Sequence, residues 1–212
     1  MSLADARIYL VAPARIAAGD VAALIPDLVA AGVGIFQLRE RKDLEAGALM
    51  SAAEPIADAC RRAGIPFVVN DRPDVALALE ADGVHVGQDD VPPAIARRIV
   101  GDAFVGLSTH TPREVDAAVA LGDTIDYIAV GPVEATPTKP GRAGTGFEIV
   151  TYAARRIPAE KPWFVTGGMR PKTIPALLAA GGSRVVVVRA ITEAKDPIKA
   201  THAIREALTE IS

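Results

Sequence analysis

The feature that most constrains this chain is a series of eight short apolar runs, each followed by a segment with helical character. The apolar runs are residues 8–12, 34–38, 66–70, 83–87, 103–107, 127–131, 163–167 and 184–188. The helical segments are residues 20–31, 43–63, 73–80, 92–99, 111–121, 147–157, 171–180 and 196–209. Strict alternation of strands and helices is typical of βαβ units, and eight such units can close into a (β/α)8 barrel.

Composition agrees with an α/β protein built as a single domain over residues 1–212. Half of the residues are hydrophobic but only 4% are aromatic, which favours a parallel sheet packed with aliphatic side chains and covered by helices. We expect a single-domain TIM barrel. An open doubly wound sheet is the alternative, because periodicity does not report closure. Pro26 and Pro55 lie inside two predicted helices, which we expect them to kink or end.

Charge and hydropathy exclude several classes of protein. A net charge of −3 provides no basic surface for a polyanion, so we expect no nucleic-acid partner. The sequence has no run of 18 apolar residues and no basic N-terminal segment followed by an apolar one. We therefore expect no membrane insertion, no export and a cytoplasmic location. Cys60 has helical spacing from Ala53 and Ile56, and we interpret it as a core thiol.

Polar residues gather where the predicted strands end, whereas the opposite loops mostly stop helices with glycine. In chain order these polar residues are Gln37, Arg39, Arg41, Asn70, Asp71, His85, Gln88, Asp89, Asp90, Ser108, His110, Thr136, Thr138 and Lys139. Barrels and open α/β sheets bind ligands at the carboxyl ends of their strands, so this end is the predicted site.

The segment QLRER, residues 37–41, contains two arginines at alternate positions. Alternation places Gln37, Arg39 and Arg41 on one side of a strand if the extended conformation continues that far. Guanidinium groups bind pyrophosphate oxygens in a bidentate way. The alternative is a surface ion-pair patch with Glu40 and Asp43.

Asp71 and Asp90 follow neighbouring predicted strands, without a Cys or His partner that would favour a transition metal. Carboxylates in this arrangement suit a hard cation such as Mg²⁺, which commonly uses one or two protein carboxylates, waters and phosphate oxygens. Asp71 could instead cap the helix that begins near Pro73.

Three further segments contain groups that can bind phosphate. The loop 132–146 includes TPTKPG, and loops of this length in compact domains are often functional. TGGM (166–169) and VVVVRA (185–190) follow the seventh and eighth strands, where many barrels bind phosphate. Ordinary turns are the alternative for each segment.

Two of the three histidines lie near this end. We interpret His85 as a packed or hydrogen-bonded core residue, whereas His110 either titrates in the site or caps the fifth helix. The sequence indicates no Ser, His and Asp constellation, so we do not predict acyl transfer.

Together these motifs resemble the thiamine-phosphate synthase family. They are QLRER (37–41), NDRPDVAL (70–77), ADGVHVGQDD (81–90), GLSTHT (106–111), GPVEATPTKPG (131–141) and TGGM (166–169), in family order over almost the whole chain. The resemblance implies a (β/α)8 barrel and a transferase that joins hydroxymethylpyrimidine diphosphate to a thiazole phosphate. It also implies release of pyrophosphate, use of Mg²⁺ and a pyrimidine-methyl cation that the thiazole nitrogen traps.

The resemblance assigns residues to each role, with Asp71 and Asp90 as the metal ligands. The pyrimidine diphosphate would be bound by Gln37, Arg39, Arg41, Asn70, Ser108 and Lys139. The thiazole phosphate would be bound by Thr136, Pro137, Thr138, Gly168, Val188 and Arg189. Leu38 and Glu40 complete the substrate-binding set, and the catalytic residues would be Arg39, Arg41, Ser108 and Lys139.

Three positions depart from the family pattern. Arg41 replaces the usual Lys, Arg189 replaces the usual Ser, and Thr166 replaces an aliphatic residue. Two alternatives stay open: the related thiazole tautomerase, a metal-free isomerase with a histidine at the His110 position, and a non-catalytic module that binds thiamine-pathway phosphates. The sequence is compatible with a homo-oligomer but does not define one.

Overall fold

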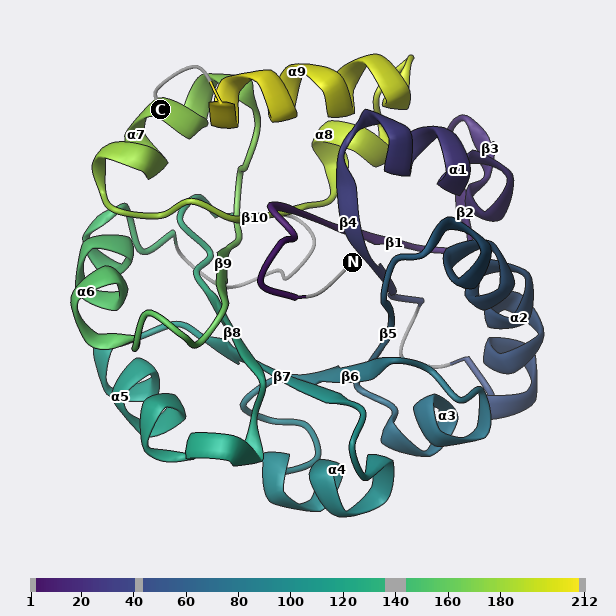
Figure 1. Ribbon diagram of the computed structural model, residues 1–212, viewed down its shortest axis with the longest axis horizontal. Helices are drawn as coiled ribbons and strands as arrows, with labels where there is room; N and C mark the ends of the chain where they lie inside the picture. The colour runs from purple at the N-terminus through teal and green to yellow at the C-terminus, as the bar shows by residue number, and fades with distance from the viewer. Residues whose placement is uncertain (1–2, 41–43, 136–143, 210–212) are drawn as a thin grey trace.

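The computed structural model describes residues 3–40, 44–135 and 144–209. In these residues, parallel strands form a closed barrel in the order β1-β10-β9-β8-β7-β6-β5-β4 (Figure 1). The strands are β1 (Ile8–Ala12), β4 (Val33–Leu38), β5 (Phe67–Asn70), β6 (Gly83–Val86), β7 (Phe104–Thr109), β8 (Tyr127–Val130), β9 (Trp163–Val165) and β10 (Val185–Val187). The predicted α/β barrel is confirmed, and closure excludes the open sheet.

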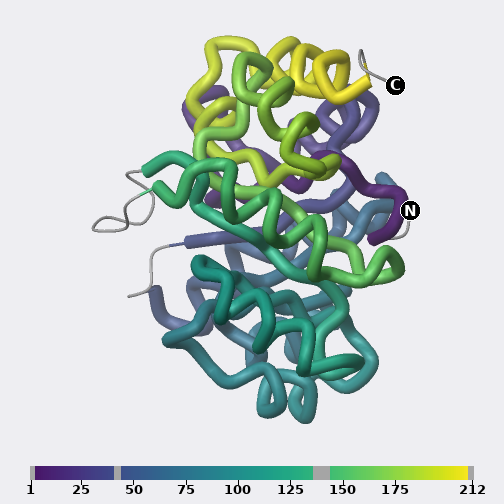
Figure 2. The backbone as a smooth tube through the Cα atoms, turned by 90° about the vertical axis from the view of Figure 1, so that its left-hand side faces the viewer, coloured from purple at the N-terminus to yellow at the C-terminus, as the bar shows by residue number. Residues whose placement is uncertain are grey.

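Helices surround the barrel. They are α1 (Val21–Ala31), α2 (Ala46–Ala63), α3 (Pro73–Ala78), α4 (Pro93–Val100), α5 (Pro112–Ala120), α6 (Glu148–Arg156), α7 (Ile174–Ala179), α8 (Arg189–Thr192) and α9 (Pro197–Thr209). Several begin with proline, whose fixed φ suits the first helical position and whose missing N–H costs nothing there. Figures 1 and 2 show α9 (yellow) beside α1 (purple), so the last helix closes the ring on the first.

Short elements supplement this pattern. The chain after β1 forms a small hairpin of β2 (Arg15–Ile16) and β3 (Gly19–Asp20), and 3₁₀ turns η1 (Gly122–Thr124) and η2 (Pro171–Thr173) precede β8 and α7. Among the described residues, no helix is long and apolar enough to cross a membrane. The assignment of residues 1–212 to one domain includes positions outside the described residues and stays a prediction.

Pro26 and Pro55 lie inside continuous helices, so the expectation that they end their helices is wrong, whereas a kink stays a prediction. Both prolines are on exposed helix faces, where water can bond the carbonyl that each leaves without an N–H partner. Packing of the opposite face stabilises the helix: α1 buries Val21, Ile25 and Leu28.

Two hydrophobic clusters form the core. The larger lies between the strands and the helices, and it includes Cys60, whose interpretation as a core thiol is confirmed. Burial raises the pKa of Cys60 to about 12. The smaller cluster fills the barrel interior and includes Tyr9, Tyr127 and Phe164, whose rings meet edge to face. Alternation along each strand separates the two clusters.

Carboxylates brace the amino-terminal ends of two strand pairs. Asp82, just before β6, accepts a hydrogen bond from the Phe67 N–H at the start of β5 (2.8 Å). Asp126, just before β8, accepts one from the Val105 N–H in β7 (2.7 Å) and also pairs with Arg97 of α4. These bonds lie at the end of the barrel opposite the predicted site, so we assign them to stability.

Candidate active site

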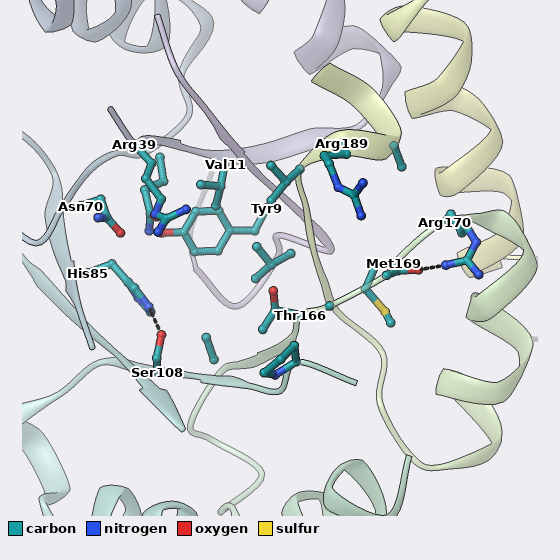
Figure 3. Close-up of a pocket in the computed structure, with 18 of the residues that line it drawn as sticks. Tyr9, Val11, Arg39, Asn70, His85, Ser108, Thr166, Met169, Arg170 and Arg189 are labelled. Carbon is teal, nitrogen blue, oxygen red and sulfur yellow. Dashed lines mark hydrogen bonds between the residues drawn. The ribbon is translucent and has the colours of Figure 1, made fainter. Parts of the chain in front are cut away.

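A pocket of about 460 Å³ lies at the carboxyl ends of the barrel strands. On one side it is lined by Gln37 of β4, Arg39 just after β4, Asn70 of β5 and Ser108 of β7. On the other side it is lined by residues that follow β9 and β10, among them Gly168, Val188 and Arg189. Figure 3 shows these two groups facing the same space, with Arg39, Asn70 and Ser108 opposite Arg189.

Five buried side chains form a continuous chain of hydrogen bonds across the barrel beneath this space. Gln37 Nε2 donates to the Tyr9 hydroxyl (2.6 Å), which lies 2.8 Å from the Tyr127 hydroxyl. The Tyr127 hydroxyl contacts His85 Nδ1 (3.1 Å), and His85 Nε2 contacts Ser108 Oγ (2.9 Å, Figure 3). The five residues come from β4, β1, β8, β6 and β7. Burial raises the pKa of both tyrosines far above its usual value, so their hydroxyls stay protonated.

Asp71 follows β5 directly and adopts a left-handed backbone conformation with φ of 61°, which Asp tolerates better than most residues. Its N–H donates to the His85 carbonyl (2.8 Å), which extends the β5–β6 pairing by one residue. The N-cap residue of α3 is Arg72, not Asp71. The alternative in which Asp71 is the N-cap residue of this helix is therefore wrong.

Asp90 lies in the loop that follows β6, the neighbouring strand. Its carboxylate accepts a hydrogen bond from the Gly87 N–H (3.0 Å). Gln88 Nε2 donates to the Ser108 carbonyl (2.7 Å), which fixes this loop against β7. Asp71 and Asp90 thus lie in the loops that follow two adjacent strands, at the same end of the barrel. The described residues contain no group of three or more His, Cys, Asp or Glu that could hold a metal.

The glycine turn after β9 is held by an ion pair between two loops. Arg170 donates to both carboxylate oxygens of Glu134 (2.7 and 3.1 Å) and to the Gly168 carbonyl (2.7 Å). The hydrogen bond from Arg170 holds the pKa of Glu134 below its usual range. Gly168 has φ of 75°, and a Cβ there would lie 2.3 Å from Glu134 Oε2. The turn therefore requires glycine at this position.

Comparison with known proteins identifies the family. The model described as thiamine monophosphate synthase matches residues 8–191. The chain belongs to the thiamine monophosphate synthase family. It is 48% identical to the thiamine-phosphate synthase of Acidothermus cellulolyticus (94% of this chain, 93% of that protein) and 47% identical to that of Mycobacterium bovis (98% and 96%).

A solved structure agrees with this assignment. The thiamine phosphate pyrophosphorylase of Pyrococcus furiosus superimposes with a TM-score of 0.85 at 25% identity, covering 98% of both chains. The family predicted from the sequence is confirmed, and with it a transferase enzyme.

Of the described residues that the thiamine monophosphate synthase family implies, Asp71 and Asp90 are not among those that line the pocket. The placement of others is not described. Arg41, Thr136, Pro137, Thr138 and Lys139 lie outside the described residues.

Two other residues of the implied set, Leu38 and Glu40, have structural roles outside the pocket. Leu38 is buried in the cluster beneath the helices, so its side chain points away from the site. The Glu40 carboxylate accepts a hydrogen bond from the Ala14 N–H (2.7 Å) and braces the loop after β1.

Both histidines near the predicted site, His85 and His110, line the pocket. His85 is buried and hydrogen-bonded as predicted, but it lines the pocket as well. The N-cap of α5 is Thr111, whose side chain accepts from the Glu114 N–H, so His110 does not cap this helix. His110 lines the pocket, and its Nδ1 contacts the Gly131 carbonyl.

Sequence reasoning missed Tyr9, Tyr127 and the pair Glu134–Arg170. Tyr9 lies in a run that is apolar at every position, so polarity does not mark its inward face. The strand alternation could have identified it, because Tyr9 and Val11 share the inward side with Gln37 on the adjacent strand. Glu134 and Arg170 are 36 positions apart, and no local pattern links them.

Proposed function

We propose that this protein catalyses thiamine-phosphate synthesis, joining hydroxymethylpyrimidine diphosphate to a thiazole phosphate with release of pyrophosphate. The observation that carries the proposal is one continuous pocket with two different polar walls. The wall of β4, β5 and β7 offers a guanidinium, an amide and a hydroxyl, whereas the wall after β9 and β10 offers a glycine turn and Arg189. Two phosphorylated substrates can therefore lie side by side in it.

The first wall suits a diphosphate leaving group. When the bond between the pyrimidine methylene carbon and the diphosphate oxygen breaks, its electron pair stays on that oxygen and the carbon becomes cationic. Donors that face the developing negative charge lower the barrier because they are fixed before the reaction. We assign this role to Arg39, Asn70 and Ser108, and extend it by family resemblance to Arg41 and Lys139. The thiazole nitrogen then bonds to the methylene carbon.

The acidic rim fits Mg²⁺. Asp71 and Asp90 supply hard oxygen donors from adjacent strand ends, and two protein carboxylates are a common number for this ion when phosphate and water oxygens complete its coordination. When bound, Mg²⁺ would neutralise charge on the diphosphate.

The second wall suits the thiazole phosphate. Gly168 lines this wall with backbone atoms alone, so a phosphate can approach its N–H closely. A side chain at this position would collide with Glu134. Val188 and Arg189 line the same wall, and Arg189 adds a cation where the family usually has Ser. We assign Thr136, Pro137 and Thr138 to this phosphate by resemblance alone.

One observation favours a second candidate, the thiazole tautomerase reaction: His110 lines the pocket. Purified protein incubated with both substrates and Mg²⁺ distinguishes the two. The synthase releases pyrophosphate only when both substrates and the metal are present. Tautomerisation without pyrophosphate release would favour the isomerase, and calorimetric binding without any turnover would favour a non-catalytic module. A cytoplasmic location and a homo-oligomeric state stay predictions.

A further inference from the structure

The hydrogen-bond chain from Gln37 to Ser108 has a direction that its donors determine. The Gln37 amide N–H donates to the Tyr9 oxygen, so the Tyr9 proton is available for another acceptor. The Tyr127 oxygen lies 2.8 Å away. Tyr9 and Tyr127 are almost completely buried, at 1% and 0% exposure, and a buried hydroxyl proton without an acceptor is unfavourable. Tyr9 therefore donates to Tyr127.

The same reasoning continues to the pocket. The Tyr127 hydroxyl, having accepted from Tyr9, donates to His85 Nδ1. A neutral imidazole that accepts at Nδ1 carries its proton at Nε2, and this nitrogen contacts Ser108 Oγ. Ser108 Oγ thus accepts a hydrogen bond from His85 Nε2, and the hydroxyl proton of Ser108 must be donated to another acceptor. Ser108 lines the pocket, where a ligand oxygen can serve.

We propose that this buried chain fixes Ser108 as a hydrogen-bond donor to an anionic oxygen of the ligand, with Tyr9, Tyr127 and His85 as positioning residues. This deepens the proposed function and rests on it for the identity of the ligand, the diphosphate of the pyrimidine substrate. The opposite direction would make Ser108 donate to His85 and present only lone pairs to the pocket. Lone pairs would repel a diphosphate.

The packing around Tyr127 supports a fixed chain. Its ring stacks on the imidazole of His85 with centroids 5.5 Å apart. Gly106, two residues before Ser108 on β7, leaves room for this ring, because a Cβ there would lie 2.1 Å from Tyr127 Cζ. The strand that carries Ser108 is therefore shaped to hold the tyrosine that orients it.

The direction can be measured without turnover. Long-range ¹⁵N–¹H NMR of the full chain labelled at histidine reports which ring nitrogen carries the proton. The protein has three histidines, and the signals that persist in both His110→Gln and His202→Gln belong to His85. We expect a neutral ring protonated at Nε2. A ring protonated at Nδ1 would overturn the proposal, because the chain would then run towards Gln37.

Tyr127→Phe tests the consequence for the reaction. It keeps the ring but removes the donor to His85 Nδ1, so a second population protonated at Nδ1 should appear in the NMR spectrum. We expect kcat to fall about fivefold, the effect of one neutral hydrogen bond, with a smaller change in KM, since the contact strengthens as the leaving group gains charge. The matched control is Tyr152→Phe, which removes a hydroxyl bonded to Asp116 on the outside of the barrel and should leave both readouts unchanged.

A folded Tyr127→Phe protein with unchanged tautomer and unchanged kcat would contradict the proposal. If the wild-type protein releases no pyrophosphate, the proposed reaction fails, whereas the tautomer of His85 still decides the direction of the chain.

Discussion

The hydroxyl oxygens of Tyr9 and Tyr127 lie 2.8 Å apart inside the barrel, although 118 positions separate the two residues in the chain. Tyr9 belongs to β1 and Tyr127 to β8, and two other strands, β10 and β9, lie between them in the sheet. Only a closed sheet directs both side chains into one interior. The polar chain beneath the pocket is thus a product of barrel closure, and residues that shape the interior should affect both stability and activity.

Gly106→Ala should destabilise the protein and disturb the site. The added methyl group would overlap the Tyr127 ring, and overpacking of this kind costs about 1–3 kcal/mol. We expect a lower free energy of unfolding in urea together with a reduced kcat. Gly47→Ala is the matched control, because Gly47 is a helical residue of α2 with nothing near its Cβ position. Alanine there should be neutral or should stabilise by up to about 1 kcal/mol. Equal stability of both variants would show that the interior has room for the methyl group.

Asp126→Ala should lower stability without affecting catalysis. The Asp126 carboxylate accepts from the Val105 N–H and pairs with Arg97, and loss of these partly buried bonds should cost about 2 kcal/mol. Asp82→Ala removes one backbone bond, to Phe67, and should cost about 1 kcal/mol. Urea unfolding and initial rates on the same samples check both points. A large loss of kcat in folded Asp126→Ala would contradict the assignment of stability to one end of the barrel and of catalysis to the other.

Glu134 should titrate below the usual glutamate range because Arg170 donates hydrogen bonds to its carboxylate. A depressed pKa in the folded protein means that the pair contributes at neutral pH and is lost as the pH falls through that pKa. Both side chains are more than 40% exposed, so the contribution to global stability should stay below about 1 kcal/mol. Carboxyl ¹³C NMR measures the titration.

Arg170→Met should raise the pKa of Glu134 towards its ordinary value. Arg156→Met is the control, because Arg156 pairs with Asp116 on other helices and should leave Glu134 unchanged. The same midpoint in Arg170→Met and in the wild-type protein would mean that the pair does not form in solution.

Asp71→Asn and Asp90→Asn should each reduce turnover by about a hundredfold at limiting Mg²⁺, because loss of a ligand should cost at least as much as loss of a partner that only orients a ligand, which costs about 10–100-fold. Folding should be largely retained, since both residues lie in loops that follow strands and not within a helix or strand. Asp89→Asn is the control, because it removes a neighbouring carboxylate to which we assign no role in metal binding. Rates unchanged across a Mg²⁺ titration would remove Asp71 and Asp90 from the metal site.

Much of the fold could be predicted because buried parallel strands and amphipathic helices each leave a periodic signal. The prediction was weakest where that signal is absent. The strand β7 continues to Thr109, two residues beyond the apolar run, because Ser108 and Thr109 still pair with β8. The helix α8 has four residues and the hairpin strands have two each, too few to show a period.

The site could be predicted only where polarity contrasts with the neighbouring residues. Gln37 and Arg39 stand out at the end of an apolar strand, and both line the pocket. Tyr9 and Tyr127 lie within apolar strands, so nothing local shows that their hydroxyls meet. Arg170 is one of many surface arginines in the sequence until the fold brings it to Glu134. Contacts of this kind depend on closure of the barrel and not on local pattern.

The most direct test of the account is a crystal structure of the protein with Mn²⁺ in place of Mg²⁺ and with pyrophosphate. Its anomalous scattering distinguishes the metal from water and from the lighter atoms of the protein. We predict a peak at the Asp71 and Asp90 carboxylates, with pyrophosphate oxygens beside it and facing Arg39 and Ser108. A peak elsewhere, or pyrophosphate bound without contact between the metal and either carboxylate, would contradict the assignment of this rim as the metal site.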